Sequence, residues 1–149
     1  MSEDNPIRVF VAHNFAEDDD YLRVFEFLAS LERFFYVNCS RPENLPGAGG
    51  LAAINEELTR QIGESEAVII PATTFSQNTD LVRFQMDAAE AAGKPLIALR
   101  PFGRLAETPK ELVERANEHI NWNEQEIAHA LRRQARQQDT SRWDVIDFP

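Results

Sequence analysis

The sequence predicts a doubly wound α/β domain built on a five-stranded parallel sheet. Three short runs are continuously apolar, as expected of strands buried on both faces: residues 9–12 within a first strand at 7–12, residues 67–71 and residues 96–99. Residues 34–39 and 119–122 are two further, less regular strand candidates. Segments with helical spacing separate all five, and strands that alternate with helices form parallel sheets. The flavodoxin-like strand order 2-1-3-4-5 is therefore the expected arrangement.

The first two predicted helices flank a long loop. An acidic run at residues 17–20 supplies a cap and first-turn carboxylates for a helix that reaches about residue 33. Residues 40–50 contain two prolines and three glycines, which is the composition of a loop. A second helix, with apolar side chains at helical spacing, begins at residue 51. Long loops in α/β domains often carry function, so we expect residues 40–50 to fold over a site as a lid.

A third helix follows the third strand. We expect a loop at residues 76–79 and then a helix that Thr79 or Asp80 caps, since a short side-chain oxygen satisfies a free first-turn N–H. Gly93 suits the position just past the end of a helix. Pro95 keeps the helix from restarting before the next strand.

The apolar stripe of this third helix contains a polar residue. At about 100° per residue, Leu81, Ala88 and Ala92 share one stripe, and Gln85 lies in the middle of it. A buried polar side chain needs a hydrogen-bond partner. Either Gln85 bonds a neighbouring backbone group, or it faces a cleft at the edge of the core. Helix geometry alone favours the first alternative, since buried polar groups are normally satisfied internally.

Two more capped helices are expected near the end of the domain. Thr108 and Glu111 fit a capping box, with a proline at the first helical position. Asn123, with Glu126 three residues later, is expected to cap a last helix that ends near Arg136.

The chain is expected to hold one domain, residues 1–136, followed by a tail, residues 137–149. The tail is polar at first and then carries four large apolar side chains: Trp143, Val145, Ile146 and Phe148. These side chains either pack back on the domain or dock on a partner.

Composition excludes several classes of function. A formal net charge of −10 argues against binding to nucleic acid and to anionic membranes. The single Cys39 rules out an internal disulfide and a cysteine-rich metal site. No apolar run is long enough to span a bilayer and no signal-peptide pattern is present, so a cytoplasmic protein is expected. The acids at 17–20 suggest a receiver-type magnesium site, but the aspartate required after the third strand is missing, so no metal is expected.

Several blocks of the sequence resemble TIR-like domains. They are Leu-Val-Arg-Phe-Gln at 81–85, Ala-Ala at 88–89, Gly-Lys-Pro-Leu-Ile at 93–97 and Arg-Val-Phe-Val-Ala-His at 8–13. The blocks are most similar to the TIR subunit of bacterial Thoeris-type antiphage defence systems. The resemblance extends over residues 7–131 and implies the same doubly wound sheet.

The resemblance implies a substrate and a catalytic position. That branch typically carries Trp-Val-Arg-Tyr-Glu, so Leu81 stands at the Trp position and Gln85 at the Glu position. The Glu is catalytic in TIR enzymes, which cleave the bond between nicotinamide and ribose in NAD; a carboxylate there stabilises the positive charge on the ribose. Gln85 keeps the shape of the Glu without its charge. We therefore expect this chain to bind NAD and to turn it over far more slowly than a Gln85→Glu variant.

Three functions remain open at this point. The first is a TIR-family NAD-cleaving enzyme whose ADP-ribose-derived signalling nucleotide activates a separate antiphage effector, with Gln85, natural or engineered, neutralising the site. The second is a natural non-catalytic TIR-like module for sensing or assembly, which self-assembles through TIR surfaces. The third and weakest is a nucleoside deoxyribosyltransferase-like enzyme, which needs a carboxylate nucleophile that the sequence does not place in the crevice.

The expected site is a crevice outside the carboxyl ends of the first and third strands, where doubly wound sheets bind ligands. Its expected lining is Ala12, His13, Asn14, Thr73, Thr74, Phe75, Ser76 and Gln85. The resemblance adds Leu81, and Arg41 in the loop is a candidate for pyrophosphate. His13 either contacts phosphate, acts as an acid or base, or simply ends the strand. Phe10 and Phe75 either stack on a ring of the nucleotide or belong to the core.

Overall fold

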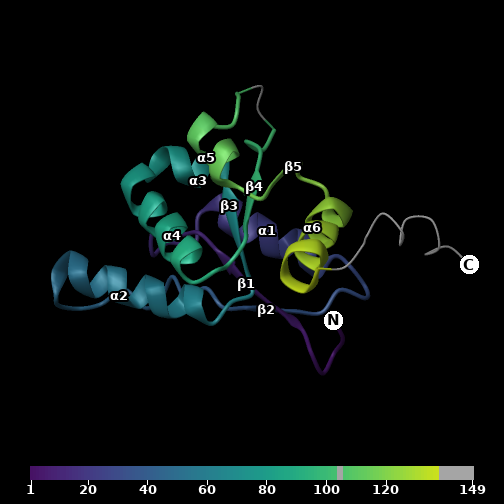
Figure 1. The fold of residues 1–149 in the computed structure, drawn as a ribbon, viewed down its shortest axis with the longest axis horizontal. Coiled ribbons are helices and arrows are strands. Elements are labelled where there is room, and N and C mark those ends of the chain that lie inside the picture. The colour runs from purple at the N-terminus through teal and green to yellow at the C-terminus, as the bar shows by residue number, and fades with distance from the viewer. Residues whose placement is uncertain (104–105, 138–149) are drawn as a thin grey trace, which may run out of the picture.

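The computed structural model describes residues 1–103 and 106–137 and confirms the predicted fold class (Figure 1). Five parallel strands form one flavodoxin-like sheet in the order β2-β1-β3-β4-β5. The strands are β1 Ile7–Val11, β2 Tyr36–Asn38, β3 Ala67–Pro71, β4 Leu96–Leu99 and β5 Glu118–Ile120. The apolar side chains expected in the tail, from Trp143 to Phe148, lie outside the described residues.

Six helices lie in the described part of the chain, one more than the sequence predicts. They are α1 Asp19–Ala29, α2 Gly50–Gly63, α3 Ala72–Gln77, α4 Thr79–Ala91, α5 Lys110–Arg115 and α6 Glu124–Arg136. The additional helix is α3, so the loop expected at residues 76–79 is wrong. Ala72, Thr74 and Phe75 of α3 are buried, and this packing overrides the weak helix propensity of the Thr-Thr segment.

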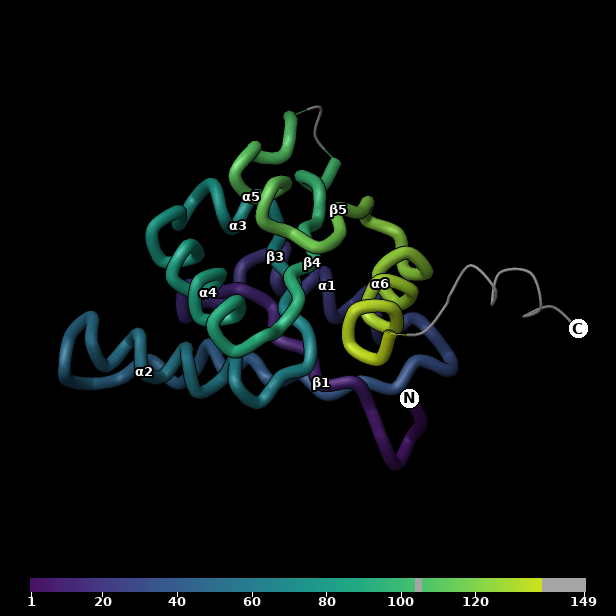
Figure 2. The backbone as a smooth tube through the Cα atoms, in the orientation of Figure 1, coloured from purple at the N-terminus to yellow at the C-terminus, as the bar shows by residue number. Residues whose placement is uncertain are grey.

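Side chains alternate across the sheet and build two apolar cores, one on each face. The backbone view shows α2 and α4 on one side of the sheet and α6 on the other (Figure 2). Ile7, Val9 and Val11 of β1 pack on the face that α1 and α6 cover. Phe10 packs on the opposite face, which α2, α3, α4 and α5 cover. Because helices cover both faces, β3 and β4 are apolar at every position, as the sequence indicates.

The ends of α4 differ in part from the prediction. Neither Thr79 nor Asp80 caps the helix; Asn78 holds the N-cap position without a side-chain cap bond. The Thr79 hydroxyl instead donates to the carbonyl oxygen of Phe75, 2.9 Å away, because the preceding residues are helical. Gly93 has a φ of +71° after the last turn, which confirms its predicted place at the helix end. Ala92 is exposed, not on the buried stripe as predicted.

The two predicted caps near the end of the domain have opposite outcomes. The capping box at Thr108 does not form, because its hydroxyl lies 2.7 Å from Nε2 of His119, and α5 has no side-chain cap bond. Asn123 does cap α6, and its Oδ1 accepts from the amide of Glu126 at 3.0 Å.

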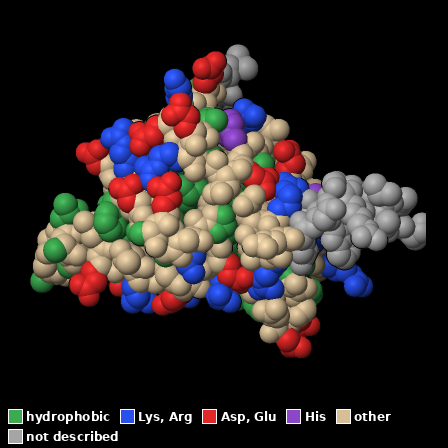
Figure 3. Space-filling view, in the orientation of Figure 1, with side chains coloured by type: hydrophobic (Ala, Val, Ile, Leu, Met, Phe, Trp, Pro, Cys, Tyr) green, Lys and Arg blue, Asp and Glu red, His purple; other side chains and the backbone are tan. Residues whose placement is uncertain are grey.

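Charged side chains of both signs are intermixed over α4 and α5, at the upper left of Figure 3. Arg83 of α4 pairs with Glu111 of α5 at 2.7 Å. Arg115 of α5 pairs with Asp87 at 2.6 Å and also with Glu90. Exposed ion pairs each contribute little to stability, so this network mainly sets how α5 lies against α4. Among the described residues, no helix is both long and apolar enough to cross a bilayer.

Candidate functional site

Gln85 is held by the backbone at the end of β1. Its side-chain Oε1 accepts from the His13 amide at 3.1 Å, and its Nε2 donates to the His13 carbonyl oxygen at 2.8 Å. Nε2 also lies 3.2 Å from the carbonyl oxygen of Leu81, one turn earlier in α4. The side chain has no solvent-exposed surface. Of the two alternatives for Gln85, the structure therefore has the bond to a neighbouring backbone group.

His13 is fully buried and has a defined tautomer. The Phe15 amide donates to Nδ1 at 3.0 Å, so Nδ1 carries no proton. Nε2 must then carry the proton, and it donates to Oε1 of Gln61 at 2.9 Å. Burial lowers the pKa of His13 below its ordinary value, although the bond to Gln61 and nearby carboxylates act in the opposite direction. His13 is thus a neutral, satisfied side chain, which is the third of the roles that the sequence left open.

Gln61 of α2 continues this polar cluster into the loop after β2. Its Oε1 accepts from the Arg41 amide at 2.8 Å, and its Nε2 donates to the Arg41 carbonyl oxygen at 3.1 Å. Gln85 bonds the amide and carbonyl of His13 in the same way. Each glutamine therefore holds one loop at the carboxyl edge of the sheet, the loop after β1 or the loop after β2. Sequence analysis missed Gln61, although it is a polar residue on the apolar stripe of α2, between Leu58 and Ile62, just as Gln85 is on the stripe of α4.

The other predicted residues fall into two groups. Phe10 and Phe75 are buried in the core, together with Ala12. Ser76 is exposed and Leu81 is half-buried at the same edge of the sheet.

Two predicted residues with polar side chains lie on the surface of this edge. The exposed Asn14 donates from Nδ2 to Oδ1 of Asn78 at 3.0 Å, which ties the loop after β1 to the junction of α3 and α4. The Arg41 guanidinium donates to the carbonyl oxygens of Asn38, at 2.6 Å, and Ser40, at 2.8 Å. Arg41 therefore stabilises its own loop.

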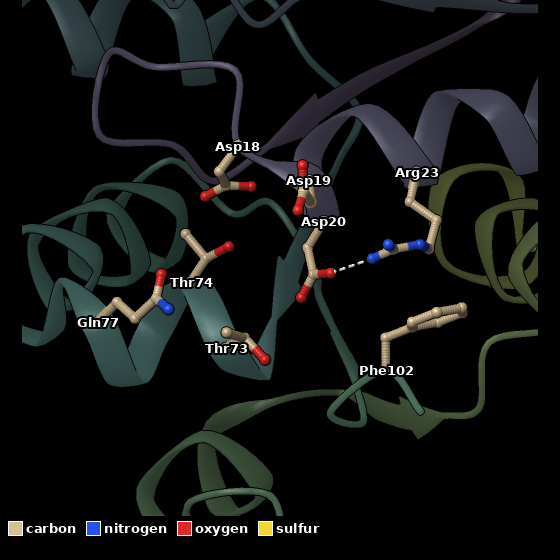
Figure 4. Close-up of a pocket in the computed structure, with 8 residues that line it drawn as sticks. All are labelled: Asp18, Asp19, Asp20, Arg23, Thr73, Thr74, Gln77 and Phe102. Carbon is tan, nitrogen blue, oxygen red and sulfur yellow. Dashed lines mark hydrogen bonds and ion pairs between the residues drawn. The ribbon is translucent and has the colours of Figure 1, made fainter. Parts of the chain in front are cut away.

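A crevice of about 280 Å³ opens at the carboxyl ends of the central strands (Figure 4). Eight residues line it: Asp18, Asp19, Asp20, Arg23, Thr73, Thr74, Gln77 and Phe102. They come from the start of α1, from α3 and from the loop after β4, so the crevice lies at the predicted switch point. Thr73 and Thr74 were expected there, whereas Gln85 is absent from the lining.

The crevice contains carboxylates, and the expectation that it would hold none is wrong. The acidic run was assigned to capping α1, and Asp18 does accept from the Tyr21 amide at 2.8 Å. The same turn, however, directs Asp19 and Asp20 toward the pocket, as Figure 4 shows. Because α1 begins at the edge of the sheet, the aspartates of its first turn belong both to the helix and to the crevice. The spacing of residues in the sequence does not reveal this second position.

The two sides of the crevice differ in their electrostatics. Asp20 pairs with Arg23, whose guanidinium carbon lies 3.8 Å from the ring centre of Phe102. Burial raises the pKa of Asp20 above its ordinary value, and the neighbouring Arg23 offsets part of this shift. Across the pocket, the Thr74 hydroxyl is buried and has no hydrogen-bond partner within the described residues. The acidic side therefore offers acceptors, and Thr74 offers an unused hydroxyl.

Comparison with known proteins assigns this chain to no family. No family model matches the chain, and no curated protein matches it. Eight solved chains match, among them the 1.60 Å crystal structure of a 3-dehydroquinate dehydratase-like protein from Bifidobacterium longum. The two chains are 15% identical with a TM-score of 0.46, over 89% of this chain and 97% of the other. A likeness at this level says nothing about activity.

Proposed function

We propose that this chain is a TIR-like module of a bacterial antiphage defence system that binds NAD at the carboxyl edge of its sheet without cleaving it. One observation carries the proposal: both polar atoms of Gln85 are bonded to the backbone of His13, and the side chain is fully buried. The TIR reaction needs a carboxylate that faces the ribose as positive charge develops there. Gln85 carries no charge, and its side chain is directed at the backbone of His13.

A carboxylate would not fit this position without change. An ionised carboxylate accepts hydrogen bonds and donates none. One of its oxygens would replace Nε2 and would face two carbonyl oxygens, those of His13 and Leu81, at 2.8 and 3.2 Å. Position 85 is thus suited to an amide that fastens α4 to β1.

Two features support NAD as the ligand. Two of the blocks that resemble TIR-like domains reach the carboxyl edge, since β1 ends there and α4 begins there. The crevice at the switch point has room for part of a dinucleotide, and doubly wound sheets bind nucleotides at such points. The ligand would reach the pocket over the exposed Asn14 and Ser76.

A second candidate is the NAD-cleaving enzyme, whose signalling nucleotide activates a separate effector. The observation that favours it is the group of three aspartates that line the crevice, Asp18, Asp19 and Asp20. A carboxylate beside the ribose would stabilise an oxocarbenium-like charge from a position other than 85. Nicotinamide release from NAD separates the two candidates.

The test of the proposal is isothermal titration of NAD into the native chain, with nicotinamide followed by mass spectrometry in the same samples. We expect saturable binding and no nicotinamide above the level in buffer. Asp20→Asn, in the crevice, should weaken binding several-fold. Glu114→Gln removes the same charge on the exposed side of α5 and should leave binding unchanged. Absence of binding at millimolar NAD would overturn the proposal, and steady nicotinamide release would favour the enzyme.

A further inference from the structure

The loop between β1 and α1 begins with a turn in an unfavourable backbone conformation. Phe15 has a φ of +63°, which lies in the left-handed region. Apart from glycines, only Gln137 also has a positive φ within residues 1–103 and 106–137. The Cβ of an L-residue makes this conformation unfavourable, and a bulky side chain makes it rarer still. The turn at Phe15 therefore needs a further interaction to hold it.

A hydrogen bond to the His13 ring provides that interaction. The Phe15 amide donates to Nδ1 of His13 at 3.0 Å. The two rings also pack edge to face, with their centroids 5.0 Å apart. The bond requires a free lone pair on Nδ1, which exists only in the neutral ring that carries its proton on Nε2. The closed turn thus depends on the protonation state of one buried side chain.

A second proton on His13 would act on Nδ1 alone. The imidazolium carries an N–H at both ring nitrogens. Nε2 would still donate to Oε1 of Gln61, which lies 2.9 Å away, so this bond to α2 survives. The N–H at Nδ1 would instead face the N–H of Phe15, and both donors would lack an acceptor in a buried place, which is unfavourable. Protonation therefore opposes the closed turn specifically.

The surroundings of His13 keep the ring neutral only while it is buried. Burial is the largest influence and lowers the pKa of His13 below 6.5, whereas the bond to Gln61 acts in the opposite direction. Three carboxylates also raise this pKa: Glu43 in the loop after β2, Asp18 at the start of α1 and Glu57 of α2. The ring packs against three further aromatic side chains, Phe10, Phe15 and Tyr21. An open turn would admit water, remove the effect of burial and leave the carboxylates to favour the cation.

We propose that His13 is a pH switch for the loop between β1 and α1. Uptake of a proton at Nδ1 breaks the bond to the Phe15 amide and releases the turn, so the loop is closed at neutral pH and opens in mild acid. The loop leads to Asp18, which lines the crevice, and its release therefore alters one wall of the crevice (Figure 4). The switch needs no ligand and does not depend on the proposed binding of NAD.

Amide hydrogen exchange, measured by NMR on the native chain without ligand, tests the switch. The protection factor of the Phe15 amide should fall by up to about tenfold per pH unit below 6.5, because protonation favours the open turn. The ¹⁵N signals of the His13 ring should show that Nδ1 gains its proton over the same pH range.

Low concentrations of urea separate release of the turn from unfolding of the domain. Opening the turn exposes little surface, so urea should barely change the exchange rate of the Phe15 amide. The Ala12 amide donates to the Ile69 carbonyl oxygen within the sheet at 2.9 Å. Its exchange requires a larger opening, and urea should accelerate it strongly.

Substitutions at position 13 separate the charge of the ring from its hydrogen bond. His13→Asn keeps an acceptor that does not titrate, because an asparagine oxygen can bond the amide two residues later. The Phe15 amide should then stay protected between pH 5 and 8. His13→Ala has no acceptor, so this amide should exchange rapidly at every pH. His119→Asn removes a half-buried histidine of β5 and should leave the exchange of the Phe15 amide as in the native chain.

The native chain alone decides the inference, even where a variant does not fold. Protection of the Phe15 amide that does not fall in acid would overturn it, and so would exchange that is as sensitive to urea as that of Ala12. A fall in protection that persists in a folded His13→Asn variant would also overturn it, because no imidazole is then present. None of these measurements involves NAD, so failure of the switch leaves the proposed function intact.

Discussion

Gln85 of α4 pairs through both polar atoms of its side-chain amide with the backbone of His13 at the end of β1. His13 lies just beyond the end of β1. The two bonds, at 3.1 and 2.8 Å, satisfy its backbone amide and its carbonyl oxygen. They also fix α4 against β1 across 72 positions of sequence. Position 85, which corresponds to a catalytic glutamate in the resemblance to TIR-like domains, therefore joins α4 to β1 in this chain.

The first prediction concerns the Gln85→Glu variant and pH. A neutral carboxyl can donate to the His13 carbonyl and accept from its amide, whereas an ionised one cannot donate. Burial and the two facing carbonyl oxygens raise the pKa of the introduced carboxyl above its unfolded value. Its stabilising contribution is then present at low pH and lost as the pH rises through the folded-state pKa. We expect the variant to be nearly as stable as the native chain at pH 4.5 and less stable by roughly 3 kcal/mol at pH 8.

Urea unfolding of both chains across this pH range checks the prediction, because the difference between them cancels the pH dependence of all other groups. Gln85→Met serves as the control, since it lacks the bonds at every pH. A stability difference between the Gln85→Glu and native chains that does not change with pH would contradict the prediction.

The second prediction concerns His13. Burial lowers its pKa below the ordinary value of 6.5, so the unfolded chain binds more protons than the folded chain at mildly acid pH. The stability that the neutral His13 contributes is therefore fully present above the unfolded-state pKa and is lost as the pH falls below it. We expect up to about 1.4 kcal/mol of stability to disappear per pH unit below 6.5 from this group.

His13→Asn should remove this part of the pH dependence, as measured by urea unfolding between pH 5 and 8. His119 supplies the matched control, because burial and Arg100 also lower its pKa but it is half-buried. His119→Asn should remove a smaller part. An unchanged pH dependence in His13→Asn would show that His13 titrates alike in the folded and unfolded chains, which would contradict the lowered pKa.

The third prediction concerns the turn into α2. Gly49 holds the N-cap position with a φ of +99°, and a Cβ there would lie 2.7 Å from the Cβ of Ala53. Gly49→Ala should therefore destabilise the chain by about 1–2 kcal/mol or more. At Gly47 nothing lies within 4 Å of an added Cβ, so Gly47→Ala should be neutral or slightly stabilising. Thermal unfolding of the two variants checks this contrast, and equal melting temperatures would contradict it.

The strands were predictable because their cause is local. Residues 67–71 and 96–99 are apolar without interruption, and only a covered sheet buries such runs on both faces. Helix α3 was not predictable, because its helical state depends on Phe75 reaching the core beneath α4. The cap at Thr108 failed for a similar reason: a tertiary bond to His119 competes with the local one.

The site was predictable in position and only partly in composition. The switch point, Thr73 and Thr74 follow from the strand order, and the polar misfit of Gln85 correctly indicated a special residue. Its partner was not predictable, since the choice between backbone and cleft depends on where β1 ends. The crevice aspartates were hidden by their second role at the start of α1, where Asp18 is the cap.

The most direct test is nicotinamide release from NAD by the native chain and by Gln85→Glu, with products identified by mass spectrometry and folding verified by circular dichroism. We expect no release above the level in buffer from either chain, because Gln85 holds α4 to the end of β1 and does not line the crevice. Release by the Gln85→Glu variant alone would contradict this expectation. That result would mean that Gln85 occupies the neutralised catalytic position of an NAD-cleaving enzyme.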